Sequence, residues 1–169
     1  LEQPGVLHLA THATFDNQSP ESSYIHLWNE PLSMKDFSEL GWGDADLELL
    51  ILSACSTALS GRNSELGFAG LAAAAGVDAT VGSLWEVSDV GTLALMSEFY
   101  TQLESTDMRF DALRQAQLSL LRGETRIADG DLVTSRGSTD LPDDWNLPEN
   151  ATLEHPFFWS AFTMIGNPW

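Results

Sequence analysis

The sequence of 169 residues lacks the features that stabilise small secreted proteins and those that bind nucleic acids. It contains one cysteine, which excludes an intrachain disulfide and a four-thiolate metal site. Lys and Arg number 7 against 25 Asp and Glu, and the resulting formal charge of −18 disfavours contact with a phosphate backbone or an anionic membrane. Basic peptides or proteins are therefore the favoured partners.

Longer sequence patterns are missing as well. No apolar run is long enough to cross a membrane and no signal peptide is present, so we expect a cytoplasmic protein. The Gly-x-Ser-x-Gly motif of α/β acyl hydrolases is absent, which disfavours a small-molecule hydrolase. We expect neither a metal nor a cofactor. Because the chain opens on Leu1 and enters a strand-like run by Gly5, we expect it to be the C-terminal portion of a longer polypeptide.

Apolar runs of strand length alternate with amphipathic patterns along the chain. The runs and the final aromatic segment, which we expect to be strands, are 5–12, 47–54, 78–85 and 155–169. Helical spacing of apolar residues predicts helices over 32–40, 65–77, 90–103 and 111–123. This alternation predicts an α/β fold, a three-layer αβα sandwich with a mostly parallel sheet in one domain spanning 1–169.

Several local expectations accompany this fold. Ser33 is expected to cap the helix over 32–40, whose inward face would carry Met34, Phe37 and Leu40. The inward faces of the two later helices would carry Leu93, Met96, Tyr100 and Leu103, and then Leu113, Ala116, Leu120 and Leu121. Residues 124–152 are rich in Gly, Pro, Asp and Ser, and we expect a long, weakly packed loop there.

The cysteine follows directly after a predicted strand. In parallel sheets the working residues gather at the carboxyl ends of the strands, where Cys55 and His12 both fall. A thiolate nucleophile needs a neighbouring base, for which imidazole is the usual choice, and the small residues around Cys55 leave room for a polypeptide. The alternatives are a buried, inert thiol and a hydrogen-bonded core histidine.

The remaining histidines lie at less suggestive positions. His8 falls in the middle of a predicted strand, His26 in a loop, and His155 directly before Pro156. Only His12 has the strand-end position that the predicted chemistry requires.

Five stretches together resemble the CHAT domain family, which comprises caspase-like domains often attached to tetratricopeptide repeats. They are "LHLATHA", "LLILSACSTAL", "VGSLWEVSD", "ALRQAQLSLLRG" and "HPFFWSAFTMIGNPW", and the likeness is greatest to cyanobacterial, hence bacterial, members. The resemblance covers nearly the whole chain. It implies a caspase-hemoglobinase fold with a dyad of His12 and Cys55. It also implies an incomplete N-terminus, because that fold has two strands before the histidine strand.

The resemblance further implies how an oxyanion would be held. The donors would be the backbone N–H groups of Cys55 and of Ala13, which stands where many relatives have glycine. The segment "SLWEVSD" also resembles the corresponding part of separases, which implies that Glu86 or Asp89 recognises a basic side chain, with Ser53 in the pocket wall. Asp89 is also typical of the N-cap of a helix that begins at Val90.

Trp85 fits two interpretations. It would support an incoming extended peptide at the sheet edge, or it would simply pack in the core.

Two functions follow as hypotheses. The first is a caspase-like (clan CD) cysteine endopeptidase in which His12 and Cys55 cleave a protein partner after a basic residue, regulated by upstream repeat domains. The second is a catalytically silent module in which the same fold only binds partners.

Overall fold

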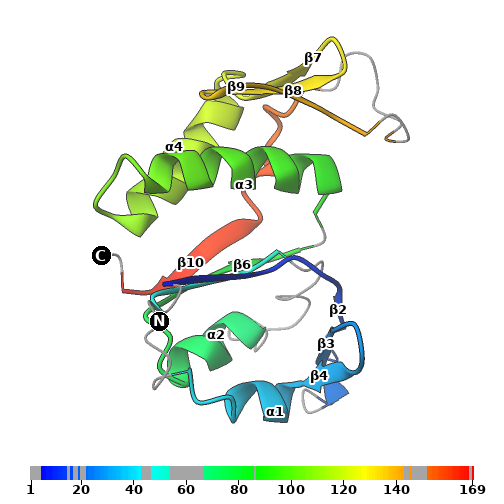
Figure 1. Cartoon of the computed structure of the whole chain (residues 1–169), viewed down its shortest axis with the longest axis vertical. Coiled ribbons are helices and arrows are strands. Elements are labelled where there is room, and N and C mark those ends of the chain that lie inside the picture. The colour runs from blue at the N-terminus through cyan, green and yellow to red at the C-terminus, as the bar shows by residue number, and fades with distance from the viewer. Residues whose placement is uncertain are drawn as a thin grey trace. The chain divides into compact units, whose positions relative to one another are not determined.

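The computed structural model describes most of the chain in two compact units. The described residues are 5–14, 16, 19, 22–42, 47–53, 67–85, 87–142, 145, 152–167 and 169. Unit 1 comprises 1–86 and 161–167, and unit 2 comprises 87–160 and 168–169. The sequence predicted one domain spanning 1–169. The chain instead leaves unit 1 after its third sheet strand and returns to it only near the end of the sequence (Figure 1).

Unit 1 is built on a four-stranded sheet with the order β1-β5-β6-β10. Its strands are β1 (Val6–Leu9), β5 (Leu49–Leu52), β6 (Ala79–Ser83) and β10 (Phe162–Gly166). The first three are parallel and β10 pairs with β6 in the antiparallel direction. The prediction of an α/β fold with a mostly parallel sheet is confirmed.

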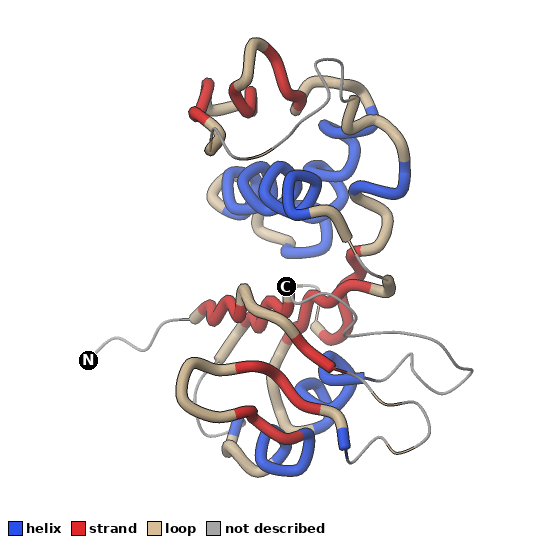
Figure 2. The backbone as a smooth tube through the Cα atoms, turned by 90° about the vertical axis from the view of Figure 1, so that its right-hand side faces the viewer, coloured by secondary structure: helices blue, strands red, loops and turns tan. Residues whose placement is uncertain are grey.

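The composition of the central strands follows from burial on both faces. All four residues of β5 and all five of β6 are buried, which is why neither strand shows alternation: β5 is a continuous apolar run, and β6 combines apolar residues with the buried Thr80 and Ser83. Helix α2 (Gly67–Ala74) packs on one face through Phe68 and Ala72. Helix α1 (Met34–Ser38) lies on the same side of the sheet (Figures 1 and 2).

Helix α1 begins where the sequence predicts. The hydroxyl of Ser33 accepts a hydrogen bond from the backbone N–H of Asp36, so its assignment as N-cap is confirmed. Phe37 is fully buried against Trp42 and Phe68. Leu40 was wrongly assigned to the inward face, because α1 ends at Ser38 and Leu40 is 52% exposed.

A second, antiparallel sheet fills the stretch that the sequence presented as a polar loop. It has the order β2-β3-β4, with β2 (Ala13–Thr14), β3 (Tyr24–His26) and β4 (Pro31–Ser33). Ala13 pairs with Ile25, and both pack into the core of unit 1. One face of this small sheet therefore packs against the core of unit 1, and the opposite face carries polar and aromatic side chains.

Unit 2 contains a helical hairpin of α3 (Asp89–Leu103) and α4 (Arg109–Leu121), shown in Figure 2. The side chain of Ser88, not that of Asp89, accepts the capping hydrogen bond from the N–H of Gly91, which corrects the reading of Asp89 as N-cap. In α4, Leu113, Ala116 and Leu120 are buried as predicted, whereas Leu121 is 45% exposed.

The predicted inward face of α3 was also partly wrong. Leu93 is 37% exposed and Met96 is buried, and the buried face runs mainly through Ala94, Leu95 and Phe99. The reason is close packing at Gly91, whose missing Cβ would lie 3.0 Å from both the ring and the carbonyl oxygen of Phe158. That contact places Gly91 on the inward face of α3, which apolar spacing alone does not indicate.

The expected loop over 124–152 contains a three-stranded antiparallel meander, so the loop prediction is wrong for the part up to Asp140. The strands are β7 (Arg126–Ala128), β8 (Asp131–Thr134) and β9 (Gly137–Asp140). Asp129 and Gly130 both have positive φ between β7 and β8, as in the Asp-Gly hairpin turn. Leu132 and Thr125 are buried, so this stretch is well packed. Residues 143–144 and 146–151 lie outside the described residues.

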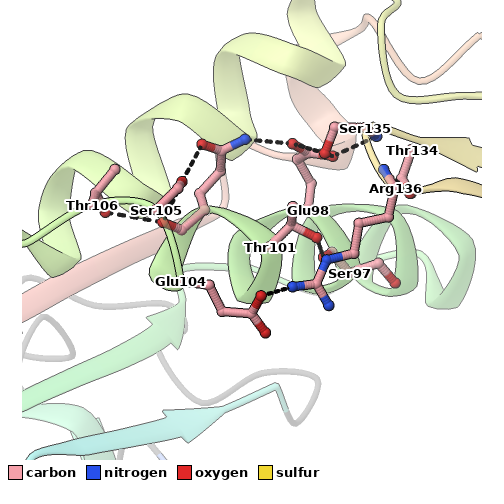
Figure 3. Close-up of polar contacts among 10 residues, drawn as sticks. Ser97, Glu98, Thr101, Glu104, Ser105, Thr106, Thr134, Ser135 and Arg136 are labelled. Carbon is pink, nitrogen blue, oxygen red and sulfur yellow. Dashed lines mark hydrogen bonds and ion pairs between the residues drawn. The ribbon is translucent and has the colours of Figure 1, made fainter.

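A buried carboxylate joins the meander to α3 (Figure 3). Glu98 is 1% exposed and accepts hydrogen bonds from Gln102 Nε2 at 2.7 Å, from Ser135 Oγ at 2.9 Å and N–H at 3.2 Å, and from Thr125 Oγ1 at 3.2 Å. Burial raises the pKa of Glu98, but the hydrogen bonds from Gln102, Ser135 and Thr125 outweigh it and hold the pKa below its ordinary value. The surroundings of Glu98 therefore favour its ionised form.

Candidate active site

The strands that lead to His12 and Cys55 are neighbours in the sheet. β1 and β5 pair in parallel with Leu9 opposite Leu52, and His12 and Cys55 each follow three residues after this last pair. Cys55 itself lies outside the described residues, as does Glu86. Of the predicted dyad, the structure therefore describes His12 and its surroundings.

His12 lies where the chain turns from the main sheet into the small one. Its carbonyl oxygen accepts a hydrogen bond of 2.8 Å from the N–H of His26, which extends the β2–β3 pairing by one residue. Since side chains alternate along a strand, His12, Thr14, Tyr24 and His26 share the outer face. His12 is exposed there, within reach of a large ligand.

A second imidazole stands beside His12. The rings of His12 and His26 are perpendicular, with centroids 6.5 Å apart and an interplanar angle of 86°. The His26 ring also contacts Tyr24 at 4.9 Å, and its Nε2 lies 3.3 Å from Thr14 Oγ1. Sequence reasoning placed His26 in a loop. The available signal was the matching alternation in "HAT" and "YIH", which places one apolar residue between two polar or aromatic ones in each short strand.

The backbone N–H of Ala13 points away from β3. In an antiparallel ladder the pairs alternate, and His12 with His26 form a hydrogen-bonded pair. The following pair, Ala13 with Ile25, is then of the other kind, whose N–H groups point away from the partner strand. Pairing with β3 does not consume this donor.

His8 joins the ends of β1 and β5. Its Nε2 lies 2.8 Å from Oγ of Ser53, the first residue after β5 and two positions before Cys55. Burial lowers the pKa of the half-buried His8 imidazole, which favours its neutral form. The mid-strand position predicted for His8 is confirmed, and the Ser53 hydroxyl, expected in a pocket wall, is engaged by this imidazole.

The residues after β6 divide between the two units. The Trp85 indole Nε1 is buried and has no hydrogen-bond partner among the described residues. Asp89 is the exposed first residue of α3 in unit 2, and the helix is capped by Ser88 in its place. Within the described stretches, no three His, Cys, Asp or Glu side chains gather in a way that would hold a metal ion.

Comparison with known proteins agrees with this architecture. None of the helices that the structure describes has the length and apolar character needed to cross a membrane. No curated protein matches the chain. The family model of the CHAT domain matches residues 1–167, which is nearly the whole sequence. With its mostly parallel sheet and flanking helices, the chain belongs to the CHAT domain family, whose fold is related to that of the caspase-like cysteine peptidases.

Proposed function

We propose that this chain is a cysteine endopeptidase in which His12 is the general base and Cys55 the nucleophile. The observation that carries the proposal is the register of β1 and β5, since both residues follow at the same distance from strand ends that are paired side by side. Parallel neighbours present their carboxyl ends at one edge, where ligands of α/β folds bind.

The reaction follows from these groups. His12 takes the thiol proton, and the thiolate attacks the scissile carbonyl carbon to form a tetrahedral oxyanion. The N–H groups of Ala13 and Cys55 are the proposed oxyanion donors, and the direction of the Ala13 N–H supports its part. The oxyanion collapses and breaks the scissile C–N bond, the imidazolium gives its proton to the leaving amine, and a thioester remains on Cys55. Water then hydrolyses this thioester with His12 again as base.

The proposed substrate is a protein cut after Arg or, less well, Lys. Asp89 is one candidate acid for recognising that side chain, and its exposed carboxylate does not cap α3. Glu86 is the second candidate acid, with Ser53 and Trp85 in the surrounding wall. The formal charge of −18 favours basic partners over nucleic acid or anionic membrane. Upstream repeat domains are the proposed regulators.

The dyad is tested with a peptide library and the variants Cys55→Ala and His12→Gln. Each is expected to lower kcat/KM by about 10²-fold or more, because general-base catalysis alone contributes about 10²–10⁴-fold. Circular dichroism and the thermal midpoint confirm folding. Since Cys55 is the only cysteine, its alkylation rate reports the thiolate directly. Alkylation at the rate of an ordinary thiol, without cleavage, would favour the binding module.

The specificity is tested with paired Arg and Leu peptides on Glu86→Gln and Asp89→Asn. Removing the acid that recognises Arg should cost about 2–5 kcal/mol in kcat/KM for the Arg peptide, the loss typical of truncating one partner of a buried charge pair. The Leu peptide should hardly change. Equal losses on both peptides would assign these acids to the fold, and a parent that prefers Leu would refute the basic pocket.

A further inference from the structure

We propose that His26 is a positioning residue, which holds the imidazole of His12 in the orientation that proton transfer requires. The inference rests on the proposed role of His12 as general base. His26 comes from β3, a strand that the family resemblance gave no role, and its contacts with His12 involve both backbone and ring.

The backbone contacts fix the two residues opposite each other. The His26 N–H donates to the His12 carbonyl oxygen at 2.8 Å. The carbonyl oxygen of His26 in turn accepts a hydrogen bond of 2.7 Å from Thr11 Oγ1. The peptide unit after the candidate base and the side chain of the residue before it are thus bonded to β3, and the ladder sets the Cα positions of the two histidines.

The ring contact then restricts the His12 side chain. His12 lies on the outer face of the small sheet and is exposed. In the described part of the chain, its one aromatic neighbour is the perpendicular ring of His26 at 6.5 Å. The His26 ring is itself fixed between Tyr24 and the Thr14 hydroxyl. Among the described residues, the two rings therefore form an aromatic pair that is supported by Tyr24 and Thr14.

An imidazole held in one orientation loses less entropy when it takes a proton from a nucleophile. Perpendicular aromatic pairs stabilise by amounts equivalent to about a two- to tenfold change in an equilibrium or rate. Because His26 is not assigned a contact with the substrate, its effect should fall on kcat rather than on KM.

The test compares His26→Ala, His26→Phe and Trp28→Ala. Trp28 follows on the same hairpin and is 98% exposed, so its removal is the matched control. His26→Ala is expected to lower kcat by about two- to tenfold with KM unchanged. His26→Phe keeps the perpendicular ring but not the contact with Thr14, and it is expected to restore most of kcat. Trp28→Ala should leave kcat unchanged.

Ring resonances of His12, assigned through His12→Gln among the four histidines, provide a readout that needs no activity. They should shift in His26→Ala and stay in place in Trp28→Ala. If His26→Ala has the kcat of the parent while His12→Gln is inactive, the positioning role of His26 is overturned and the proposed peptidase function is not. Folded His26→Phe that stays as slow as His26→Ala would also overturn it. If the parent cleaves nothing, unchanged His12 resonances in His26→Ala would overturn it independently.

Discussion

His8 is the half-buried member of the four histidines, and its surroundings differ accordingly from those of the exposed His12, His26 and His155. It sits on β1 with its ring against Ser53, so protonation would place a charge inside unit 1. A neutral imidazole avoids that cost, which is why burial lowers its pKa. The chain thus keeps one histidine for structure beside another available for chemistry.

This arrangement predicts a pH dependence of stability. In the unfolded chain His8 titrates near 6.5, and in the folded chain its pKa is lower, so below about pH 6.5 the unfolded state binds more protons. The free energy of unfolding should therefore fall as the pH drops from 6.5, until the folded pKa is passed. His8→Gln should remove this component in urea titrations at several pH values.

Ser53→Ala is the control for this measurement, because it removes the hydrogen bond but leaves the histidine to titrate. It should lower stability while keeping the pH dependence. A slope below pH 6.5 that is the same in the parent and in His8→Gln would contradict the prediction.

Residue assignments were predictable from sequence where one local interaction decides them. Ser33 caps α1 because no competing cap precedes that helix. At α3, Ser88 and Asp89 are both good caps, and the first helical turn begins one residue earlier than apolar spacing indicates. The pairing of His12 with His26 depends on which short strands meet, so the position of His26 alone could not show it.

Among the elements, α3 and the meander depend on each other through Glu98. The helix supplies the carboxylate, and the turn after β8 supplies the Ser135 donors (Figure 3). A buried carboxylate without donors would cost several kcal/mol, so the strands are needed to satisfy the helix. The hydrogen bonds of Glu98 therefore stabilise the helix and the meander together.

Glu98→Gln is expected to lower the free energy of unfolding by about 1.5–3 kcal/mol at pH 7, the range for hydrogen bonds to charged groups. The folded pKa of Glu98 is below the ordinary 4.5, so its contribution is present above pH 4.5 and is lost as the pH falls through the folded value. The difference between parent and variant should shrink over that range in denaturant titrations.

Glu104→Gln provides the matched control, since Glu104 pairs with Arg136 at the exposed end of the same helix. An exposed ion pair is worth about 0–1 kcal/mol, so this variant should stay near the parent. Equal losses in the free energy of unfolding of the two variants would show that the buried hydrogen bonds of Glu98 contribute no more than an exposed ion pair.

Element prediction succeeded for β1, β5 and β6, whose apolar runs report burial, and for α3 and α4, which are long enough to show a period. It failed for the short strands β2, β3, β4, β7, β8 and β9, because strands of two to four residues carry almost no periodic signal. The Asp129-Gly130 dipeptide was a usable signal that the loop prediction overlooked, since Asp-Gly is typical of a tight hairpin with positive φ at both positions.

For the molecule as a whole, the decisive feature is the insertion of unit 2 between β6 and β10. Sequence alternation predicted the sheet but not this division, because the division depends on contacts rather than on pattern. β10 buries Phe162 and Met164 and pairs with β6 over five residues. The sheet that leads to His12 is therefore complete only with this last strand.

A chain ending at Ser160 lacks β10 and is expected to lose the cooperative thermal transition of unit 1. The reason is that β6 is left with an unpaired edge and an uncovered apolar face. Removing only Pro168 and Trp169 is the control, because β10 is left intact. Calorimetry with circular dichroism would decide. A Ser160-terminated chain that melts like the parent would contradict the prediction.

The return of β10 to β6 also sets the order of events on the ribosome. Ser83 and its partner Phe162 are about 80 positions apart, and translation at about 5–20 residues per second separates their appearance by roughly 4–16 s. Throughout that interval the nascent sheet has an open strand edge, which neighbouring chains on a polysome could pair with. Chaperones that shield strand edges during this interval would therefore raise the yield of folded chain.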